Sequence, residues 1–125
     1  RNPEMYALGK KVFAGNVRNW EAEIKKGITF AGRGMDPRWV MNIKNNIIYF
    51  KLHDQKKVLV AEKEAIERDE HSTTYHLTTN NKSWTVTIRD IFCKNGMSDD
   101  MYEYEVMVDF NGNHYLGCGI DLKNN

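Results

Sequence analysis

Apolar and polar residues alternate along most of the chain, and this period of two is the main sequence signal of a β-strand. The alternation is clearest over residues 102–110. There Glu103, Glu105 and Asp109 fall on one face, and the opposite face is apolar or aromatic at Tyr102, Tyr104, Val106, Val108 and Phe110. Such a strand buries one face and leaves the other in water. Shorter runs of the same kind predict strands over residues 39–43, 47–52, 58–61, 73–79 and 83–92.

Asparagine-rich turns separate these strands. Asn45-Asn46 and Asn80-Asn81 lie between predicted strands, and Asn111-Gly112-Asn113 follows the strand over 102–110. Asn and Gly tolerate the positive φ that tight turns require. About eight or nine short strands joined in this way favour an all-β fold, a small antiparallel β-barrel that is lipocalin-like or a closed or nearly closed meander. Closure would also remove exposed strand edges.

The last hairpin offers two registers. A two-residue loop would set Val108 opposite Tyr115 and place glycines on the core face, whereas a three-residue loop places Leu116, Cys118 and Ile120 there. We expect the three-residue loop because it buries the apolar residues, and it would point Cys118 inward.

The whole chain is predicted to be a single domain over residues 1–125, with a short helix or tail over 1–10 and the barrel over 11–122. Asn2, Pro3 and Gly9 stand at the cap, first turn and end of that short helix. Residues 61–70 stay ambiguous, because their Ala, Glu, Lys and Arg content favours a helix while their neighbours favour strands.

The three tryptophans share a spacing. Trp20, Trp39 and Trp84 each precede an isoleucine by four residues. Positions four apart on a strand face the same way, so each pair is predicted to face the core. Aromatic side chains at alternate positions could line a ligand cavity, but core filling is the favoured interpretation for the whole set: Phe13, Trp20, Phe30, Trp39, Tyr49, Phe50, Tyr75, Trp84, Tyr104 and Phe110.

Composition narrows the function classes. The 125 residues carry 18 Lys plus Arg against 17 Asp plus Glu. The basic residues gather in the first half, but they form no clustered run and accompany no recognition motif, so we expect no nucleic-acid partner. No apolar run approaches the roughly 20 residues that a membrane-spanning helix needs, so no transmembrane segment is expected.

Two cysteines, Cys93 and Cys118, are too few for a zinc site with four close ligands. A single disulfide and two buried free thiols both fit their spacing.

The four histidines show no spacing typical of a metal site, and we expect neither a metal nor a cofactor. The first residue is Arg1 rather than Met. Cleavage of a secretion signal would explain this, and so would a recombinant chain that was shortened at its start. Ser98 is not expected to be a nucleophile, because it lacks a Gly-x-Ser-x-Gly elbow and a neighbouring His.

One segment of the chain carries Gly34, Asp36-Pro37 and Trp39, and about fifty residues on come Cys93, Gly96-Met97-Ser98-Asp99, Tyr102 and Gly117-Cys118. Together these segments resemble a family of small bacterial envelope proteins, many with a lipoprotein signal and most of unknown function. The family's usual motifs are Gly-x-Glu-Pro-Phe-Trp and Cys-x-Asp-Gly-Met-Ser-Asp, and the resemblance covers about residues 30–119. The matching residues here are Gly34, Pro37, Trp39, Cys93, Gly96, Met97, Ser98, Asp99, Tyr102, Gly117 and Cys118. Asp36, Arg38 and Asn95 replace the usual Glu, Phe and Asp. The resemblance implies a Cys93–Cys118 disulfide, an exported chain and a small β-barrel, and it implies no activity.

The leading functional hypothesis is a non-catalytic binding module of the periplasm or outer cell envelope. Its site is predicted at one barrel mouth, with Asp36, Arg38, Ser98 and Asp99 as polar groups and Trp39 as the apolar floor. The partner would be an unknown small molecule or an envelope protein, and a lipid anchor upstream of Arg1 fits the resemblance.

Two alternatives belong to other classes. The chain could inhibit a cell-wall hydrolase such as lysozyme by inserting a loop that is stiffened beside Cys93. It could instead be a carboxylate-dependent hydrolase with a pair drawn from Asp36, Asp99 and Asp100.

Overall fold

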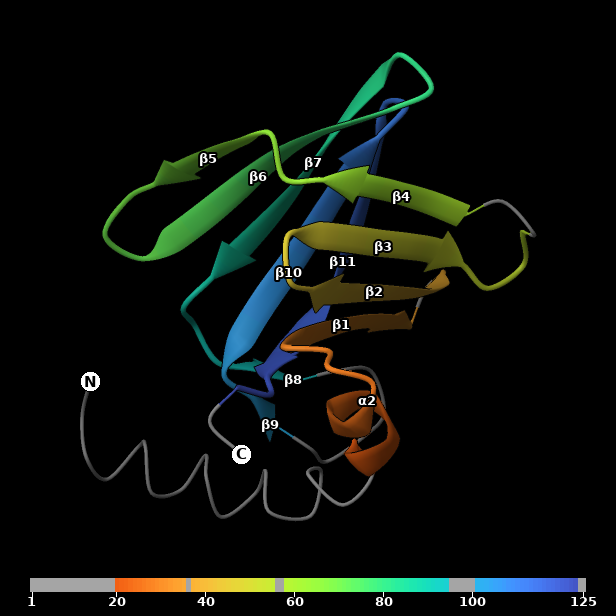
Figure 1. Ribbon diagram of the computed structural model, residues 1–125. Coiled ribbons are helices and arrows are strands. Elements are labelled where there is room, and N and C mark those ends of the chain that lie inside the picture. Colours follow the sequence, from red (N-terminus) through yellow and green to blue (C-terminus); the bar gives the residue numbers. More distant parts are fainter. Residues whose placement is uncertain (1–19, 36, 56–57, 95–100, 124–125) are drawn as a thin grey trace.

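A computed structural model describes residues 20–35, 37–55, 58–94 and 101–123. Within these ranges the chain forms a nine-stranded antiparallel sheet that curls through 273° (Figure 1). Its strands are β1 Phe30–Met35, β2 Arg38–Lys44, β3 Ile47–Leu52, β4 Val58–Glu62, β5 Ala65–Arg68, β6 Ser72–Thr79, β7 Lys82–Arg89, β10 Tyr104–Phe110 and β11 Asn113–Asp121. A two-stranded ribbon of β8 (Cys93–Lys94) and β9 (Met101–Tyr102) and a short helix, α2 (Glu21–Lys25), accompany the sheet. The predicted all-β fold is confirmed.

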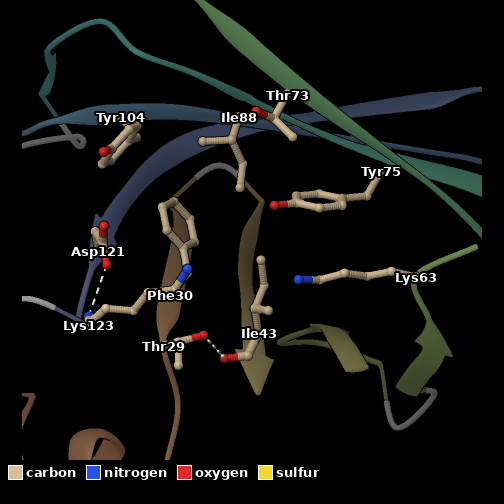
Figure 2. Close-up of a pocket in the computed structure, with 10 residues that line it drawn as sticks. All are labelled: Thr29, Phe30, Ile43, Lys63, Thr73, Tyr75, Ile88, Tyr104, Asp121 and Lys123. Carbon is tan, nitrogen blue, oxygen red and sulfur yellow. Dashed lines mark hydrogen bonds between the residues drawn. The ribbon is translucent and has the colours of Figure 1, made fainter. Parts of the chain in front are cut away.

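Most neighbouring strands are consecutive along the chain, and the pairs β1–β11 and β10–β7 are the exceptions in the described sheet. The order is β4-β3-β2-β1-β11-β10-β7-β6-β5, so the two edge strands, β4 and β5, are themselves consecutive. These two strands do not pair with each other, so the curl is nearly but not fully closed. Across this joint the Thr79 hydroxyl donates to the Val60 carbonyl at 3.0 Å, and the Glu64 N–H donates to the His76 carbonyl at 3.2 Å. Lys63 lies at the joint and points into the curl (Figure 2).

The inside of the curl holds the main core. Trp39 and Trp84 are almost fully buried there, and Phe50 lies between them with ring centroids 5.7 and 6.2 Å away. Ile43 and Ile88 share this core, which confirms that these two tryptophan–isoleucine pairs face inward. The third pair differs, because Trp20 caps the N-terminus of α2 and Ile24 lies within that helix rather than on a strand. A spacing of four residues gives a shared face in a helix as well as in a strand.

The predicted register of the last hairpin is wrong. Phe110 pairs with Asn113 and Val108 with Tyr115, so the loop has two residues. Asn111 and Gly112 have φ values of 55° and 80°, as a type I′ turn requires. Leu116 consequently faces outward and is 58% exposed.

Glycine on the core face explains this register. A Cβ atom at Gly117 would lie 2.2 Å from the Arg33 carbonyl oxygen and 2.7 Å from the Trp39 ring. A Cβ atom at Gly119 would lie 2.5 Å from the Phe30 ring. The Phe30 ring comes from the adjacent strand β1 and the Trp39 ring from β2, one strand further away, and both cross β11 where it has no side chain. The shift that would place Leu116 inside is therefore sterically forbidden.

A second core lies on the outer face of the sheet. It comprises Trp20, Ala31, Tyr102, Cys118, Ile120 and Leu122. The predictions that Cys118 points into the barrel and that Tyr102 shares a face with Tyr104 are both wrong. Cys118 alternates with two inward glycines, and Tyr102 belongs to β9, from which the chain turns at Glu103 before β10 begins.

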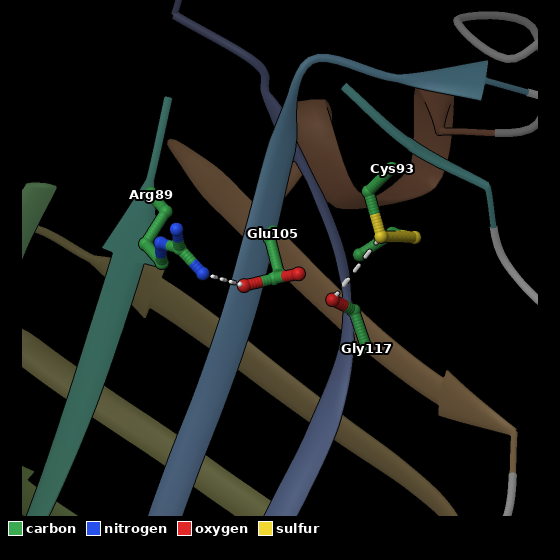
Figure 3. Close-up of a disulfide and its surroundings, with 5 residues drawn as sticks. Arg89, Cys93, Glu105 and Gly117 are labelled. Carbon is green, nitrogen blue, oxygen red and sulfur yellow. Dashed lines mark hydrogen bonds and ion pairs between the residues drawn. A yellow bond between two sulfur atoms is a disulfide. The ribbon is translucent and has the colours of Figure 1, made fainter. Parts of the chain in front are cut away.

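The Cys93–Cys118 disulfide joins β8 to β11 within this second core, with an S–S distance of 2.03 Å (Figure 3). The Cys93 sulfur also contacts the Gly117 carbonyl oxygen at 3.4 Å. Beside it, Arg89 and Glu105 form a cross-strand ion pair at 2.9 Å. The bridge therefore attaches the β8–β9 ribbon to the outside of the curl.

Two further predictions concern the N-terminal residues 1–10 and the segment 61–70. The helix predicted within residues 1–10 lies outside the described residues, as does Phe13. The ambiguous segment 61–70 is extended, and it forms the end of β4, the joint and β5.

Replacing Gly117 by alanine should lower the free energy of unfolding by about 3 kcal/mol, the upper end of the usual cost of overpacking. The reason is that the backbone oxygen of Arg33 cannot rotate away. Leu116→Ala is the matched control, and it should change stability by less than about 0.5 kcal/mol because the side chain is exposed. Chemical denaturation measures both, and a Leu116→Ala variant that is the less stable of the two would contradict the two-residue register.

Removing the disulfide with Cys93→Ala and Cys118→Ala should cost about 3.5 kcal/mol in the chain-entropy model, since the bridge spans 25 residues. Denaturation curves with and without reductant test this. Reductant should destabilise the native protein and leave the double variant unchanged, and equal sensitivity of the two proteins would rule out the bridge.

Candidate functional site

Arg38 and Trp39, two residues of the predicted site, lie side by side at the start of β2 but differ in exposure. Arg38 is exposed, whereas Trp39 is only 1% exposed and belongs to the inner core. A Cβ atom at Gly34 would lie 1.9 Å from Trp39 Nε1, and this buried nitrogen has no hydrogen-bond partner among the described residues. A ligand could touch the Trp39 ring only after the core had opened.

The other three residues of that site, Asp36, Ser98 and Asp99, lie outside the described residues, and so do the motif residues Gly96 and Met97. The site at this end of the barrel therefore stays a prediction. Pro37 is exposed in the β1–β2 turn, and the remaining motif residues serve the two cores described above.

A cavity of about 170 Å³ opens at the opposite end of the curl (Figure 2). We call it the Lys63 cavity. It lies where β1 begins and β2 ends, next to the joint between β4 and β5. Its lining residues are Thr29, Phe30, Ile43, Lys63, Thr73, Tyr75, Ile88, Tyr104, Asp121 and Lys123.

The floor of the Lys63 cavity is apolar. Phe30, Ile43 and Ile88 reach it from β1, β2 and β7, and the Phe30 ring meets Tyr104 edge-on at 5.5 Å. These inward positions follow from the strand alternation, which carries the main core to this end. A ligand here would bury apolar surface against a preformed wall.

Polar groups surround the rim. Lys63 Nζ lies 4.9 Å from the centroid of the Tyr75 ring, a cation–π contact. Within the described chain, neither the Lys63 ammonium nor the Tyr75 hydroxyl has a hydrogen-bond partner, and the Lys123 ammonium is likewise unpaired. The Thr29 hydroxyl is engaged, since it donates to the Ile43 carbonyl at 3.2 Å.

The charged side chains that line the cavity, which are Lys63, Lys123 and Asp121, carry a net positive charge when all three are ionised. Burial lowers the pKa of Lys63, and the charges of Lys123 and Arg68 lower it further. Asp121 supplies a carboxylate to the lining, and its Oδ1 accepts a hydrogen bond from the backbone N–H of Lys123. The groups around Lys63 thus disfavour its charged form, and an added negative charge would favour it.

The carboxylates of the β5 segment face away from the cavity. Glu64 accepts a hydrogen bond from Thr78 at 3.0 Å, and Glu67 pairs with His76 at 2.7 Å. Thr78 and His76 point to the outer face of β6, since their neighbours Leu77 and Tyr75 point inward. These two acids therefore do not neutralise the lysines inside.

Sequence reasoning found part of this cavity. Phe30, Tyr75 and Tyr104 were among the aromatics considered for a cavity, while Trp39 and Trp84 fill the core as expected. Lys63 was missed because the composition of residues 61–70 fits a helix as well as a strand. The face on which a side chain lies can be predicted only when the type of secondary structure is known. A strand assignment for that segment would have pointed Lys63 and Ala61 to the same face.

A shallower groove of about 820 Å³ runs over the outer face of β1–β4 beside α2. Val40, Tyr49 and Val60 form its apolar part. At its border Arg33 donates to Asn42 Oδ1 at 2.9 Å and stacks over the Trp20 ring at 4.7 Å. Burial lowers the pKa of Arg33, and electrostatic interactions with Glu23 and, less strongly, with Tyr102 act in the opposite direction.

Neither a metal centre nor a membrane helix is found in the described ranges. No three His, Cys, Asp or Glu side chains there lie close enough to hold a metal ion. Among the same residues, no helix has the length and apolar character needed to cross a membrane.

Comparison with known proteins gives no match. No protein-family model, no curated protein and no solved structure matches this chain. The resemblance to bacterial envelope proteins therefore stays a prediction, and the functional argument rests on the cavity itself.

Proposed function

We propose that this domain is a non-catalytic binding module of the bacterial cell envelope and that it holds a small molecule in the Lys63 cavity. The observation that carries the proposal is the arrangement of that cavity. The side-chain polar groups of Lys63, Tyr75 and Lys123 stand around an apolar floor, and none of them has a hydrogen-bond partner in the part of the chain that the structure describes. Such convergence of a few polar groups on an apolar pocket is the usual form of a small-molecule site.

Binding explains this cavity better than carboxylate-dependent hydrolysis does. A hydrolase of that class uses two carboxyl groups on opposite sides of the scissile bond. Among the described residues that line the cavity, Asp121 alone carries a carboxylate. The carboxylates considered for catalysis, Asp36, Asp99 and Asp100, lie outside the described residues.

The disulfide supports export. Structural disulfides form and persist in oxidising compartments such as the bacterial periplasm. The Cys93–Cys118 bridge joins two otherwise separate parts of the fold, which gives it a structural role. A periplasmic or outer-envelope location is accordingly part of the proposal.

An NMR titration with benzyl alcohol, a neutral probe with one ring, tests the binding function. The backbone amide signals of Phe30, Thr73 and Ile88 should shift, and that of Arg38 at the opposite end should not. Thr73→Phe should fill the cavity and abolish these shifts. Thr74→Phe is the matched control, because the neighbouring side chain points outward and bonds Thr87. Absence of shifts at the cavity, or shifts centred on Arg38, would count against the proposal.

One observation favours the inhibitor function as a second candidate. Lys94 pairs with Met101 in the β8–β9 ribbon, and the disulfide joins Cys93 of this ribbon to β11, so the two residues that flank the segment 95–100 are held beside each other. Inhibitory loops need such anchors, since a segment held in its bound conformation loses less entropy on binding.

A turbidity assay of bacterial lysis by lysozyme tests the inhibitor candidate. The purified domain should slow lysis, and the variant with Cys93→Ala and Cys118→Ala should slow it at least about tenfold less at equal concentration. Circular dichroism establishes that the variant is folded at the assay temperature. Full lysis rates with the native domain would eliminate lysozyme as its target.

A further inference from the structure

Two ammonium groups approach the Lys63 cavity from opposite walls. Lys63 comes from the joint between β4 and β5, and Lys123 comes from the chain just after β11. Figure 2 shows the Lys123 side chain reaching beneath the Phe30 ring, and the Lys63 side chain extending toward it past Tyr75. The fold therefore directs two positive charges into the same small space.

Like charges held together are unfavourable unless something neutralises them. Burial is the main cause that lowers the pKa of Lys63, and the charge of Lys123 lowers it further. Glu64 and Glu67 are held on the outer face, and Asp121 lies on the Lys123 side of the cavity. An anion placed between the lysines would relieve this repulsion.

The Tyr75 hydroxyl adds a donor on the same side. It points into the cavity in Figure 2 and has no hydrogen-bond partner among the described residues. Its ring face is already covered by the Lys63 ammonium at 4.9 Å, so it is not available to a ligand cation. Both features of Tyr75 favour an anion over a cation.

The volume limits what can accompany the anionic group. About 170 Å³ is close to the size of a protein cavity that holds one benzene molecule. The floor of Phe30, Ile43 and Ile88 suits an apolar fragment of that size. A fragment larger than one ring would have to extend out of the opening.

We propose that the Lys63 cavity selects small organic anions, with the carboxylate or phosphate between Lys63 and Lys123 and one ring or a short chain on the apolar floor. The Tyr75 hydroxyl donates a hydrogen bond to the same anionic group. This inference rests on the proposed binding function and adds the chemical class of the ligand.

Isothermal titration with four probes of matched size or charge tests the selectivity. Benzoate should bind at least about tenfold more tightly than benzyl alcohol, since a charge-assisted hydrogen bond contributes about 1.5–3 kcal/mol. Benzylamine should bind more weakly than benzyl alcohol because it meets two positive charges. Acetate, which lacks the ring, should bind more weakly than benzoate.

Variants assign the preference to the lysines. Lys63→Gln and Lys123→Gln should each reduce benzoate affinity about tenfold and leave benzyl alcohol affinity unchanged. Lys63→Arg keeps the charge and should keep the preference for benzoate. Lys82→Gln is the control, because Lys82 is exposed at the β6–β7 turn and lies outside the cavity lining.

The outcomes separate the inference from the proposed function. Benzyl alcohol binding in the cavity with no preference for benzoate would overturn the anion inference and leave the binding function standing. Failure of every probe to perturb the cavity residues would overturn both. If Lys63→Gln loses both probes, Lys63→Arg decides, and a Lys63→Arg variant without a benzoate preference would also overturn the inference.

Discussion

The arrangement of this protein depends on a steric constraint in β11, where two glycines on the inner face flank an outward cysteine. Trp39 crosses β11 at Gly117 and Phe30 crosses it at Gly119, each closer than any Cβ atom would allow. The same alternation turns Cys118 outward, where it joins the ribbon of β8 and β9 to a second core. One short sequence, Gly117-Cys118-Gly119, thus sets the register, the position of the disulfide and the packing of both faces.

The constraint also explains why the two ends of the curl differ. Near the β1–β2 turn the Trp39 ring fills the space over Gly117, and the core there is closed. At the other end the Phe30 ring lies against Gly119 and becomes the floor of a cavity. The joint between β4 and β5 borders this cavity, because the chain passes there from one sheet edge to the other without pairing. Lys63 stands at that joint and brings its charge to the opening.

The sequence predicted the strands well because a period of two depends only on local alternation. The turn residues Asn45, Asn80 and Asn111 all have positive φ, as their chemistry indicated. The prediction of the hairpin register was wrong because it compared only how many apolar side chains each register buries. It gave no weight to glycine on the core face, although the Trp39 and Phe30 rings need the space that a glycine leaves there. The two-residue loop was nonetheless indicated by Asn111-Gly112, the strongest short hairpin signal.

The site was harder to predict than the fold. Its residues come from most of the sheet, and their convergence follows from the curl rather than from any motif. The sequence offered two roles for Trp39, a core residue and the floor of a binding site, and the structure places it in the core. A tryptophan in an alternating strand does not indicate which of these roles it has. The charged residues of the cavity lie at strand ends or between strands. There the alternation of side chains ends, so it no longer predicts on which face a side chain lies.

The central claim is that the Lys63 cavity is built for a negative charge, and the pKa of Lys63 itself tests it most directly. NMR titration of the Lys63 side-chain signals in the free protein should give a pKa below the ordinary value of a lysine side chain. Saturating benzoate should raise that pKa, because a nearby anion favours the charged ammonium. A Lys63 pKa that is unchanged when benzoate is bound would contradict the account.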